Sequence, residues 1–163
     1  MKNVYVLAEH RNGTLRDTTW EALAAAGLIA PGLGAGVVCL LLADDVTGMA
    51  GKLVQECPKV IAVEDPAFKT FNSDAYIKCL KSLLKDESDY VLLMGASNSV
   101  IDLAPALSVE LDASMATDCF GLEVKENKLF ALRQIYSYKI NALVSFKEAT
   151  RILVTLRGVI FPF

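Results

Sequence analysis

Two short polar segments stand where a parallel sheet would bind a ligand, and they hold the side chains best suited to chemistry. The first follows an apolar run at the N-terminus and comprises Ala8, Glu9 and His10. The second follows another apolar run and comprises Gly95, Ala96, Ser97, Asn98 and Ser99. Ligands of open α/β sheets bind beyond the carboxyl ends of the strands, where small residues admit a close approach and polar side chains donate hydrogen bonds. We therefore expect both segments on one sheet edge, as the candidate cofactor-binding residues.

The second polar segment also has a structural interpretation, which the sequence leaves open. Ser97 or Ser99 would cap the helix that follows, and Gly95 would make the turn before it, because serine is a preferred helix cap. Asp102 could likewise face a ligand or cap its own helix. Both interpretations place these residues at the carboxyl end of a strand.

The sequence offers no complete set of side chains for catalysis or for metal binding. His10 is the only histidine, and because Arg11-Asn12-Gly13 follows it, an exposed loop histidine is the simpler interpretation. No nucleophile can be paired with it. The four cysteines are far apart, with no Cys-x-x-Cys pair: Cys39, Cys57, Cys79 and Cys119. This spacing favours reduced thiols in a cytoplasmic protein and offers no zinc site, so we predict no catalytic residue, no metal and no enzyme activity.

The glycine-rich stretch Gly32-Leu33-Gly34-Ala35-Gly36 suggests a dinucleotide loop, but its context is wrong. The third glycine of the G-x-G-x-x-G pattern would fall at Val37, and the stretch precedes a strand. A phosphate loop needs its glycines after a strand, opening a helix whose N–H groups face the anion. We therefore assign this stretch to a turn.

Composition excludes several classes of protein. The chain has 163 residues, 53% of them hydrophobic, and a net charge of -3, so it has no basic surplus for nucleic acid. The uncharged stretch Ala22–Ala43 is long enough to cross a bilayer, but Pro31 and the neighbouring glycines divide it into a helix end, a turn and a strand. We predict no membrane insertion and no signal peptide, because Met1-Lys2-Asn3 leads directly into a strand.

Strand-like and helix-like segments alternate through the first two thirds of the chain. Apolar runs predict strands at Asn3–Ala8, Val37–Leu42, Val60–Val63 and Tyr90–Met94. The first predicted helix begins at Thr18, where Glu21 completes a capping box, and ends within Gly27–Pro31. A second, short helix is predicted from Asp44 or Asp45 to Cys57. Two further helices are predicted over Phe71–Lys85 and Asp102–Leu111. Such alternation gives a parallel sheet with right-handed crossovers.

The last third of the chain changes character. Strand-like runs follow one another without a helix at Thr117–Val124, Lys128–Ile135, Ile140–Ser145 and Arg151–Leu156. Lys125-Glu126-Asn127 predicts a hairpin between the first two. We therefore predict one domain over residues 1–163, an α/β three-layer sandwich whose mostly parallel sheet is flanked by helices and gains antiparallel strands in the C-terminal third.

Four stretches together carry a resemblance to a known family. They are VYVLAEHRNGTLRDTTWEALAAA from residue 4, KVIAVEDPAFKTFNSDAY from residue 59, DYVLLMGASNSVIDLAPALSVELDASMATDCFGLEV from residue 89 and TLRGVIFP from residue 155. In order and spacing, this set resembles the amino-terminal domain of the electron-transfer flavoprotein alpha subunit, over essentially the whole chain. The fold of that family, an α/β domain related to the adenine-nucleotide hydrolase group, agrees with the predicted strand order.

The resemblance implies an electron-transport component. The family works as an alpha–beta heterodimer that takes electrons from dehydrogenases through FAD, which sits mainly on a second, carboxy-terminal alpha domain. The homologous beta subunit of many members holds AMP, and the amino-terminal alpha domain packs against that subunit and forms the base on which the flavin domain moves. The resemblance thus implies a beta-type partner and no cofactor on this chain alone, with AMP left open.

The sequence departs from the family pattern in three places. Val100-Ile101 stands where the family usually has Gly-Arg, and Ser137-Tyr138 follows Tyr136 where it usually has Gly-Gly. The chain ends at Phe163, where the family would continue, so we expect the FAD-binding domain to be absent.

Two other functions fit the residues. One is a small adenine-nucleotide module for AMP or ATP, using Ala8–His10 and Gly95–Ser99, although a phosphate loop is missing. The other is a structural domain that self-associates through its late strands and the Val159–Phe163 tail. Trp20, Tyr136 and Tyr138 would either form a partner surface or pack within the domain.

Overall fold

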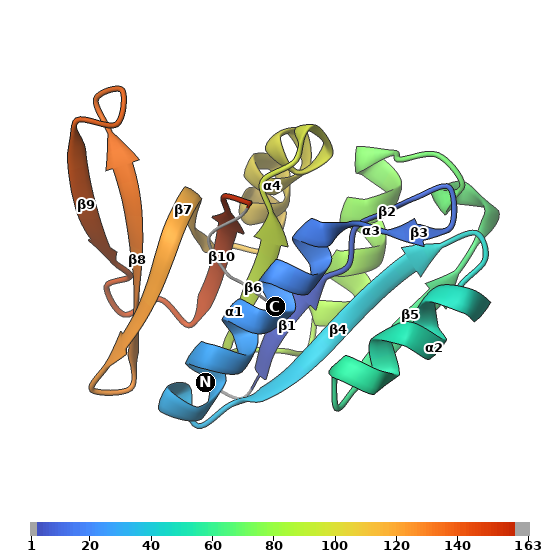
Figure 1. The fold of residues 1–163 in the computed structure, drawn as a ribbon, viewed down its shortest axis with the longest axis horizontal. Coiled ribbons are helices and arrows are strands. Elements are labelled where there is room, and N and C mark those ends of the chain that lie inside the picture. Colours follow the sequence, from blue (N-terminus) through green and yellow to red (C-terminus); the bar gives the residue numbers. More distant parts are fainter. Residues whose placement is uncertain (1–2, 159–163) are drawn as a thin grey trace.

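The computed structural model describes residues 3–158 and confirms the predicted architecture (Figure 1). These residues form an eight-stranded sheet in the order β5-β4-β1-β6-β10-β7-β8-β9. The parallel strands are β1 (Asn3–Leu7), β4 (Gly36–Ala43), β5 (Val60–Glu64), β6 (Tyr90–Gly95), β7 (Ser114–Lys125) and β10 (Arg151–Leu156). The antiparallel strands are β8 (Lys128–Ile135) and β9 (Ile140–Ser145). A small hairpin, β2 (His10–Arg11) and β3 (Thr14–Leu15), follows β1.

Helices cover both faces of the sheet, giving three layers. The apolar core on one face includes residues of α1 (Asp17–Leu33) and α2 (Thr47–Glu56), and the core on the other includes residues of α3 (Ser73–Leu84) and α4 (Asn98–Glu110). A short 3-10 helix, η1 (Pro66–Phe68), precedes α3. Every residue of β6 is buried. The near-continuous apolar runs of the central strands thus reflect burial on both faces.

Helix α1 differs from the prediction at both ends. Its N-cap is Arg16, without a side-chain hydrogen bond, so the capping box at Thr18 and Glu21 is wrong. The helix also continues through Pro31 to Leu33 and ends at Gly34, which has a φ of 61°. The N–H of Ala35 donates to the carbonyl of Ala30, so a glycine C-cap rather than the proline ends the helix. The glycine-rich stretch therefore comprises the end of α1, its Gly34 cap and the start of β4, rather than a separate turn.

The other helices begin close to the predicted caps, with one exception. Asn72 caps α3 through its side chain, which accepts a hydrogen bond from the N–H of Ala75. The N-cap of α2 is Val46, although Asp45 Oδ1 accepts from the N–H of Thr47. Helix α4 begins at Asn98, so Asp102 is exposed inside the helix and does not cap it, contrary to one of its two interpretations. The helix starts earlier because Ser97 supplies the cap.

The C-terminal third confirms the hairpin and corrects one strand. Glu126 and Asn127 form the two-residue turn between β7 and β8, with φ of 51° and 59°. Arg151–Leu156, expected among the added antiparallel strands, is instead parallel and lies between β6 and β7. Its residues after Arg151 are all buried, so this strand belongs in the centre of the sheet.

Several smaller expectations have clear outcomes. Cys39, Cys57 and Cys119 are buried, and all four cysteines are free thiols. Between residues 3 and 158, no helix combines the length and apolar character needed to cross a membrane. Trp20 packs against the core, whereas Tyr136 and Tyr138 are exposed. The Val159–Phe163 tail lies outside the described residues.

Candidate functional site

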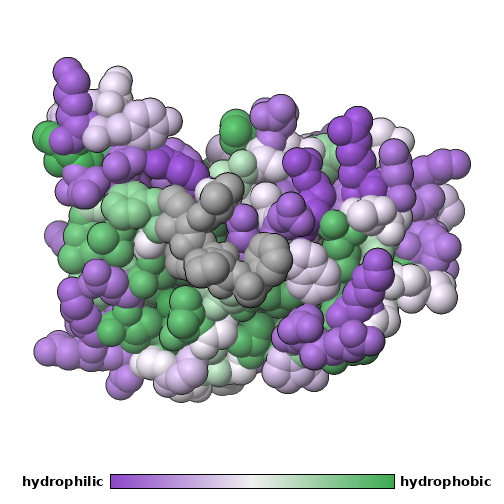
Figure 2. All heavy atoms as spheres, in the orientation of Figure 1, coloured by the Kyte–Doolittle hydropathy of each residue, from purple (hydrophilic) through white to green (hydrophobic). Residues whose placement is uncertain are grey.

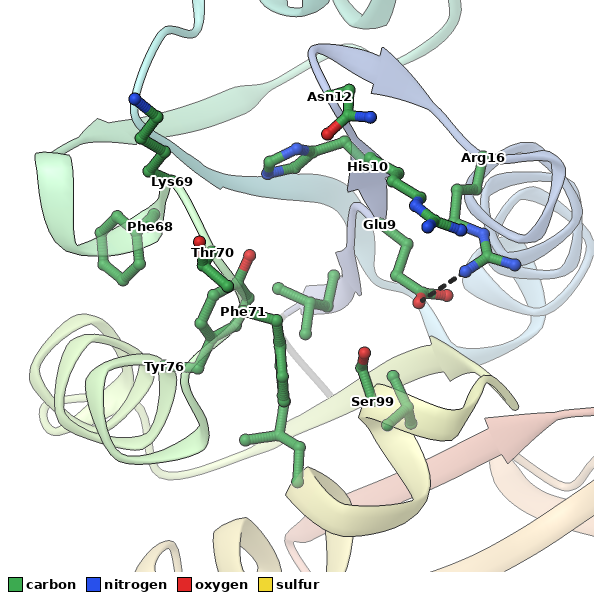
Figure 3. A pocket seen from close by; sticks show the side chains of 14 residues that line it. Glu9, His10, Asn12, Arg16, Phe68, Lys69, Thr70, Phe71, Tyr76 and Ser99 are labelled. Carbon is green, nitrogen blue, oxygen red and sulfur yellow. Dashed lines mark ion pairs between the residues drawn. The ribbon is translucent and has the colours of Figure 1, made fainter.

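The two predicted polar segments leave the sheet side by side. Strands β1 and β6 are parallel neighbours, with Val6 paired to Leu93, so both segments emerge at the same edge. Glu9, His10 and Ser99 line a pocket of about 340 Å³ at this edge (Figure 3). The two segments thus meet at one sheet edge, and part of the predicted set lines the pocket there.

The remaining predicted residues build the edge without lining the pocket. Ala8 is buried and donates its N–H to the carbonyl of Leu40. Ser97 Oγ accepts a hydrogen bond from the N–H of Val100 at 3.3 Å, which confirms the capping interpretation. Gly95, predicted to make the turn, is instead the last residue of β6; Ala96 connects it to the cap, and Asn98 is the exposed first residue of α4. These residues fix the direction in which α4 leaves the sheet.

Glu9 is the carboxylate of the pocket, and helix α1 holds it in place. Thr18 Oγ1 donates to Glu9 Oε2 at 2.9 Å, and Arg16 Nη1 lies 4.0 Å from Glu9 Oε1. Thr19 Oγ1 accepts from the N–H of Glu9 at 2.8 Å and donates to its carbonyl at 2.9 Å. The Glu9 side chain is only 13% exposed. The first turn of α1 thus restricts the Glu9 side chain to few rotamers and holds its carboxylate in place.

His10 is not the exposed loop residue that its neighbours suggested. Its Nε2 lies 2.7 Å from the carbonyl of Leu42, so Nε2 carries the proton and donates. Tyr76 donates its hydroxyl to the same carbonyl at 3.2 Å, and burial raises the pKa of Tyr76 to about 12, which keeps it a donor. The Nδ1 atom of His10 is buried and has no partner among residues 3–158. A buried acceptor therefore remains available beside the pocket.

The opposite wall of the pocket was missed by sequence reasoning. It comes from the connection between η1 and α3, where Phe68, Lys69, Thr70 and Phe71 line the pocket. Phe71 packs on Tyr76, with ring centroids 5.0 Å apart. The only local signal was Asp65 before Pro66, because the Asp65 side chain caps η1. Nothing in the sequence showed that this wall would face residues 9–16.

The charges around the pocket favour an anionic ligand. Arg11, Arg16 and Lys69 contribute three cations to the lining, against the carboxylate of Glu9. Asn12, Thr70 and Ser99 add neutral hydrogen-bonding groups, as Figure 3 shows. Residues 3–158 contain no group of three or more His, Cys, Asp or Glu side chains that could hold a metal ion. The pocket is thus suited to a phosphorylated or carboxylated ligand with hydroxyl groups.

A second polar cluster, also missed, joins β7, β8 and β10. Arg157 Nε and Nη2 donate to the two carboxylate oxygens of Asp118, at 3.0 and 2.6 Å. Arg157 Nη1 donates to Gln134 Oε1 at 2.8 Å, and the guanidinium carbon lies 4.9 Å from the ring centroid of Tyr138. These residues are far apart in the chain, and a bulge in β7 opposite β10 brings them together.

The fold and the edge pocket together define an α/β domain whose parallel sheet presents a ligand-sized site at the carboxyl ends of its strands. A family model described as the electron transfer flavoprotein domain matches residues 4–163. The chain belongs to this family, which confirms the resemblance carried by its motifs.

Relatives of known name agree with this assignment. Electron transfer flavoprotein subunit alpha of Megasphaera elsdenii is 34% identical over 128 residues, covering 78% of this chain and 38% of the relative. The subunit of the same name from Bacillus subtilis is 32% identical, covering 85% and 42%. Acryloyl-CoA reductase electron transfer subunit beta of Anaerotignum propionicum is 31% identical, covering 78% and 35%. The chain spans less than half the length of these curated relatives.

Proposed function

We propose that this chain is an electron transfer flavoprotein alpha-type domain of the cytoplasm, which supports a flavin-bearing partner. The observation that carries the proposal is the family match over residues 4–163 combined with the relatives' names. The FAD and the electron donor and acceptor contacts are assigned to partner segments, as the resemblance to the family implies. The partner is a beta-type subunit together with a flavin-bearing alpha segment, and the role is electron transport rather than catalysis.

The size of the edge pocket argues against FAD as the ligand of this pocket. Ligand pockets range from roughly 300 to 1,000 Å³, and the edge pocket, at about 340 Å³, lies at the lower end. That volume suits a mononucleotide better than a dinucleotide such as FAD. FAD would supply the redox chemistry when bound to the partner, and the residues of this chain would position that partner.

Apolar surface near the antiparallel strands also supports a covered face. Figure 2 shows hydrophobic side chains gathered over β7, β8 and β9. Leu122, Val124, Val144 and Phe146 contribute partly buried apolar groups there. Such surface is typical of chains that pack against another protein.

Co-purification tests this function directly. The chain would be mixed with a beta-type subunit and a flavin-bearing alpha segment, then run on a sizing column with absorbance recorded in the near ultraviolet and blue. We expect a complex that contains this chain and carries the flavin spectrum. A flavin band on the isolated chain, or the absence of any complex at every salt concentration, would overturn the proposal; a stable homodimer alone would favour self-association.

A second candidate function, binding of AMP or ATP at the edge pocket, is favoured by the charges there. Arg11, Arg16 and Lys69 would hold the phosphates, Glu9 would accept hydrogen bonds from the ribose hydroxyls, and Phe71 would contact the base. These roles account for a carboxylate fixed among three cations.

Thermal-shift titration with AMP and ATP tests the nucleotide site. Binding at about one hundred times the dissociation constant stabilises the folded state by about 2.7 kcal/mol, so Tm should rise by several degrees. The Arg11→Ala/Lys69→Ala double variant should lose the shift, and Lys78→Ala, exposed on α3 outside the pocket lining, should keep it. No shift in the wild type at millimolar nucleotide would remove this candidate.

A further inference from the structure

The loop between β8 and β9 holds three successive residues in left-handed backbone conformation. Tyr136, Ser137 and Tyr138 have φ of 50°, 52° and 67°. None is glycine, so each costs of order 1 kcal/mol or more. We call residues 136–139 the tyrosine loop; it closes the hairpin beyond the Ile135–Ile140 pair, at one corner of the molecule (Figure 1). Strain of this size persists only where the surroundings hold the backbone.

Arg157 is the group that holds the tyrosine loop. Its guanidinium lies 4.9 Å from the Tyr138 ring centroid and donates to Gln134, which lies directly before Ile135 at the base of the hairpin. The same guanidinium is fixed by its two hydrogen bonds to Asp118. One side chain thus connects the end of β10, the bulge of β7 and the loop.

The tyrosine loop nevertheless leaves its aromatic side chains in water. Tyr136 is 73% exposed and Tyr138 is 66% exposed. On the adjoining strand β9, Ile140 directly follows the loop and is 50% exposed, so apolar surface adjoins the two tyrosines. Tyrosine and arginine are the residues most enriched among those that dominate binding energy at protein interfaces. The tyrosine loop exposes two tyrosines beside an arginine, so its residues match those that dominate binding at protein–protein interfaces.

The charge around the tyrosine loop specifies the partner. Arg133, Lys139 and Arg157 are cationic, and Asp118 is the carboxylate that both arginines influence electrostatically. This local positive surplus lies in a chain whose net charge is -3. The Nε of Arg133 is buried without a hydrogen-bond partner in the described part of the chain. The complementary surface is therefore one that offers carboxylates around an apolar centre.

We propose that the tyrosine loop, with Arg157 behind it, is a docking surface for an acidic face of the flavin-bearing partner. The proposal rests on the proposed function, because it names the surface through which that partner binds. The two tyrosines insert into the partner, and Lys139 with the arginines pairs with its carboxylates at the rim. The loop conformation is already fixed before binding, so association loses little conformational entropy in ordering the loop.

Affinity measurements with the assembled flavin-bearing partner test this docking surface. Calorimetric titration would compare wild type with Tyr136→Ser, Tyr138→Gly and Lys139→Glu. We expect each tyrosine change to weaken binding by about tenfold or more, as truncation of a central aromatic does. Lys139→Glu should weaken binding strongly at low salt and much less at high salt, because exposed charges are screened. Circular dichroism and Tm confirm that each variant folds.

Matched controls separate this docking surface from the rest of the molecule. Lys52→Glu on α2 changes the same charge at an exposed position, and Val109→Ser on α4 removes an apolar side chain that is 79% exposed. Both should bind as the wild type does. If wild type binds and the loop variants bind equally well, the docking surface is elsewhere while the proposed function stands. If wild type does not bind at all, the proposed function fails, and the docking proposal that rests on it fails too.

Discussion

Arg157 and Asp118 lie 39 positions apart in the chain and form a bidentate ion pair where a bulge in β7 interrupts its pairing with β10. Asp118 has a φ of 55°, and its N–H donates to Thr155 Oγ1 at 2.8 Å. The backbone of β7 is therefore bent so that the Asp118 carboxylate meets the end of β10. This pair connects the parallel neighbours β7 and β10, and the hydrogen bond from Arg157 to Gln134 extends the connection to the antiparallel strand β8.

The Arg157–Asp118 pair predicts a pH-dependent contribution to stability. Hydrogen bonds from Arg157 hold the pKa of Asp118 below its usual value of 3.8. Because the folded-state pKa is lowered, the contribution is complete above about pH 4 and is lost as the pH falls through the folded value. Asp118→Asn should lower Tm at neutral pH by the equivalent of about 1 kcal/mol, since the pair is half exposed.

Calorimetric scans between about pH 3 and 7 check this prediction. The difference in Tm between wild type and Asp118→Asn should be constant near neutrality and shrink at the acid end. Asp86→Asn, another exposed aspartate, should leave Tm unchanged at neutral pH. A difference that persists undiminished at pH 3 would show that the pair acts through packing rather than charge.

Ser137 offers a test of the strain in the tyrosine loop. Glycine adopts a φ of 52° without a steric penalty, so Ser137→Gly should stabilise the fold by about 0.5–1 kcal/mol and raise Tm by roughly 1–4 °C. The same substitution at Ser82, exposed inside helix α3, should lower Tm, because glycine is a poor helix former. Urea unfolding curves for both variants measure the two signs. A fall in stability for Ser137→Gly would mean that this loop residue is not strained.

The sequence predicted the alternation of strands and helices and the parallel part of the sheet well, because burial on both faces leaves a direct mark on the strands. Strands such as β6 are apolar throughout and have no polar face, which favours the centre of a parallel sheet. The Glu126-Asn127 turn was also predictable, since short polar residues tolerate the positive φ that the hairpin needs. Arg151–Leu156 was misjudged because its position depends on a crossover that no local pattern records.

The candidate site was only half predictable for a similar reason. Strand ends pointed to Glu9 and Ser99, but the Lys69–Phe71 wall meets them only through tertiary packing. At Thr18 a local rule gave the wrong answer, because its hydroxyl donates to Glu9 instead of capping α1. A capping box and a tertiary hydrogen bond compete for the same hydroxyl group, and the sequence does not show which one forms.

Gly95 is predicted to be essential for the close contact between β6 and α1. A Cβ at this position would lie 2.5 Å from Thr18 Cβ, an atom fixed to the helix backbone. Gly95→Ala should therefore destabilise the protein by about 1–3 kcal/mol, as overpacking does. Gly27→Ala, in open space on the same helix, should stabilise it by about 0.5–1 kcal/mol. Equal effects of the two changes in urea unfolding would contradict the close contact.

The four thiols are predicted to react in a fixed order. Burial raises the pKa of Cys39 to about 12 and that of Cys119 to about 11, so the reactive thiolate is scarce at both. Cys57 is buried and donates its thiol to the carbonyl of Lys59 at 3.2 Å. Burial also raises the pKa of Cys79, but this thiol is the only one of the four that is not fully buried. Cys79 should therefore be the first to react with a thiol reagent at about pH 8.

Mass spectrometry of a labelling time course checks the order of reaction. Native protein should gain one label quickly and the other three only after urea is added, because labelling of a buried thiol requires unfolding. Cys79→Ser should abolish the fast phase, whereas Cys119→Ser should leave it unchanged. Rapid native labelling of Cys39 or Cys119 would mean that the sheet opens locally. Such opening would be inconsistent with β4 and β7 as rigid supports for the edge pocket and the tyrosine loop.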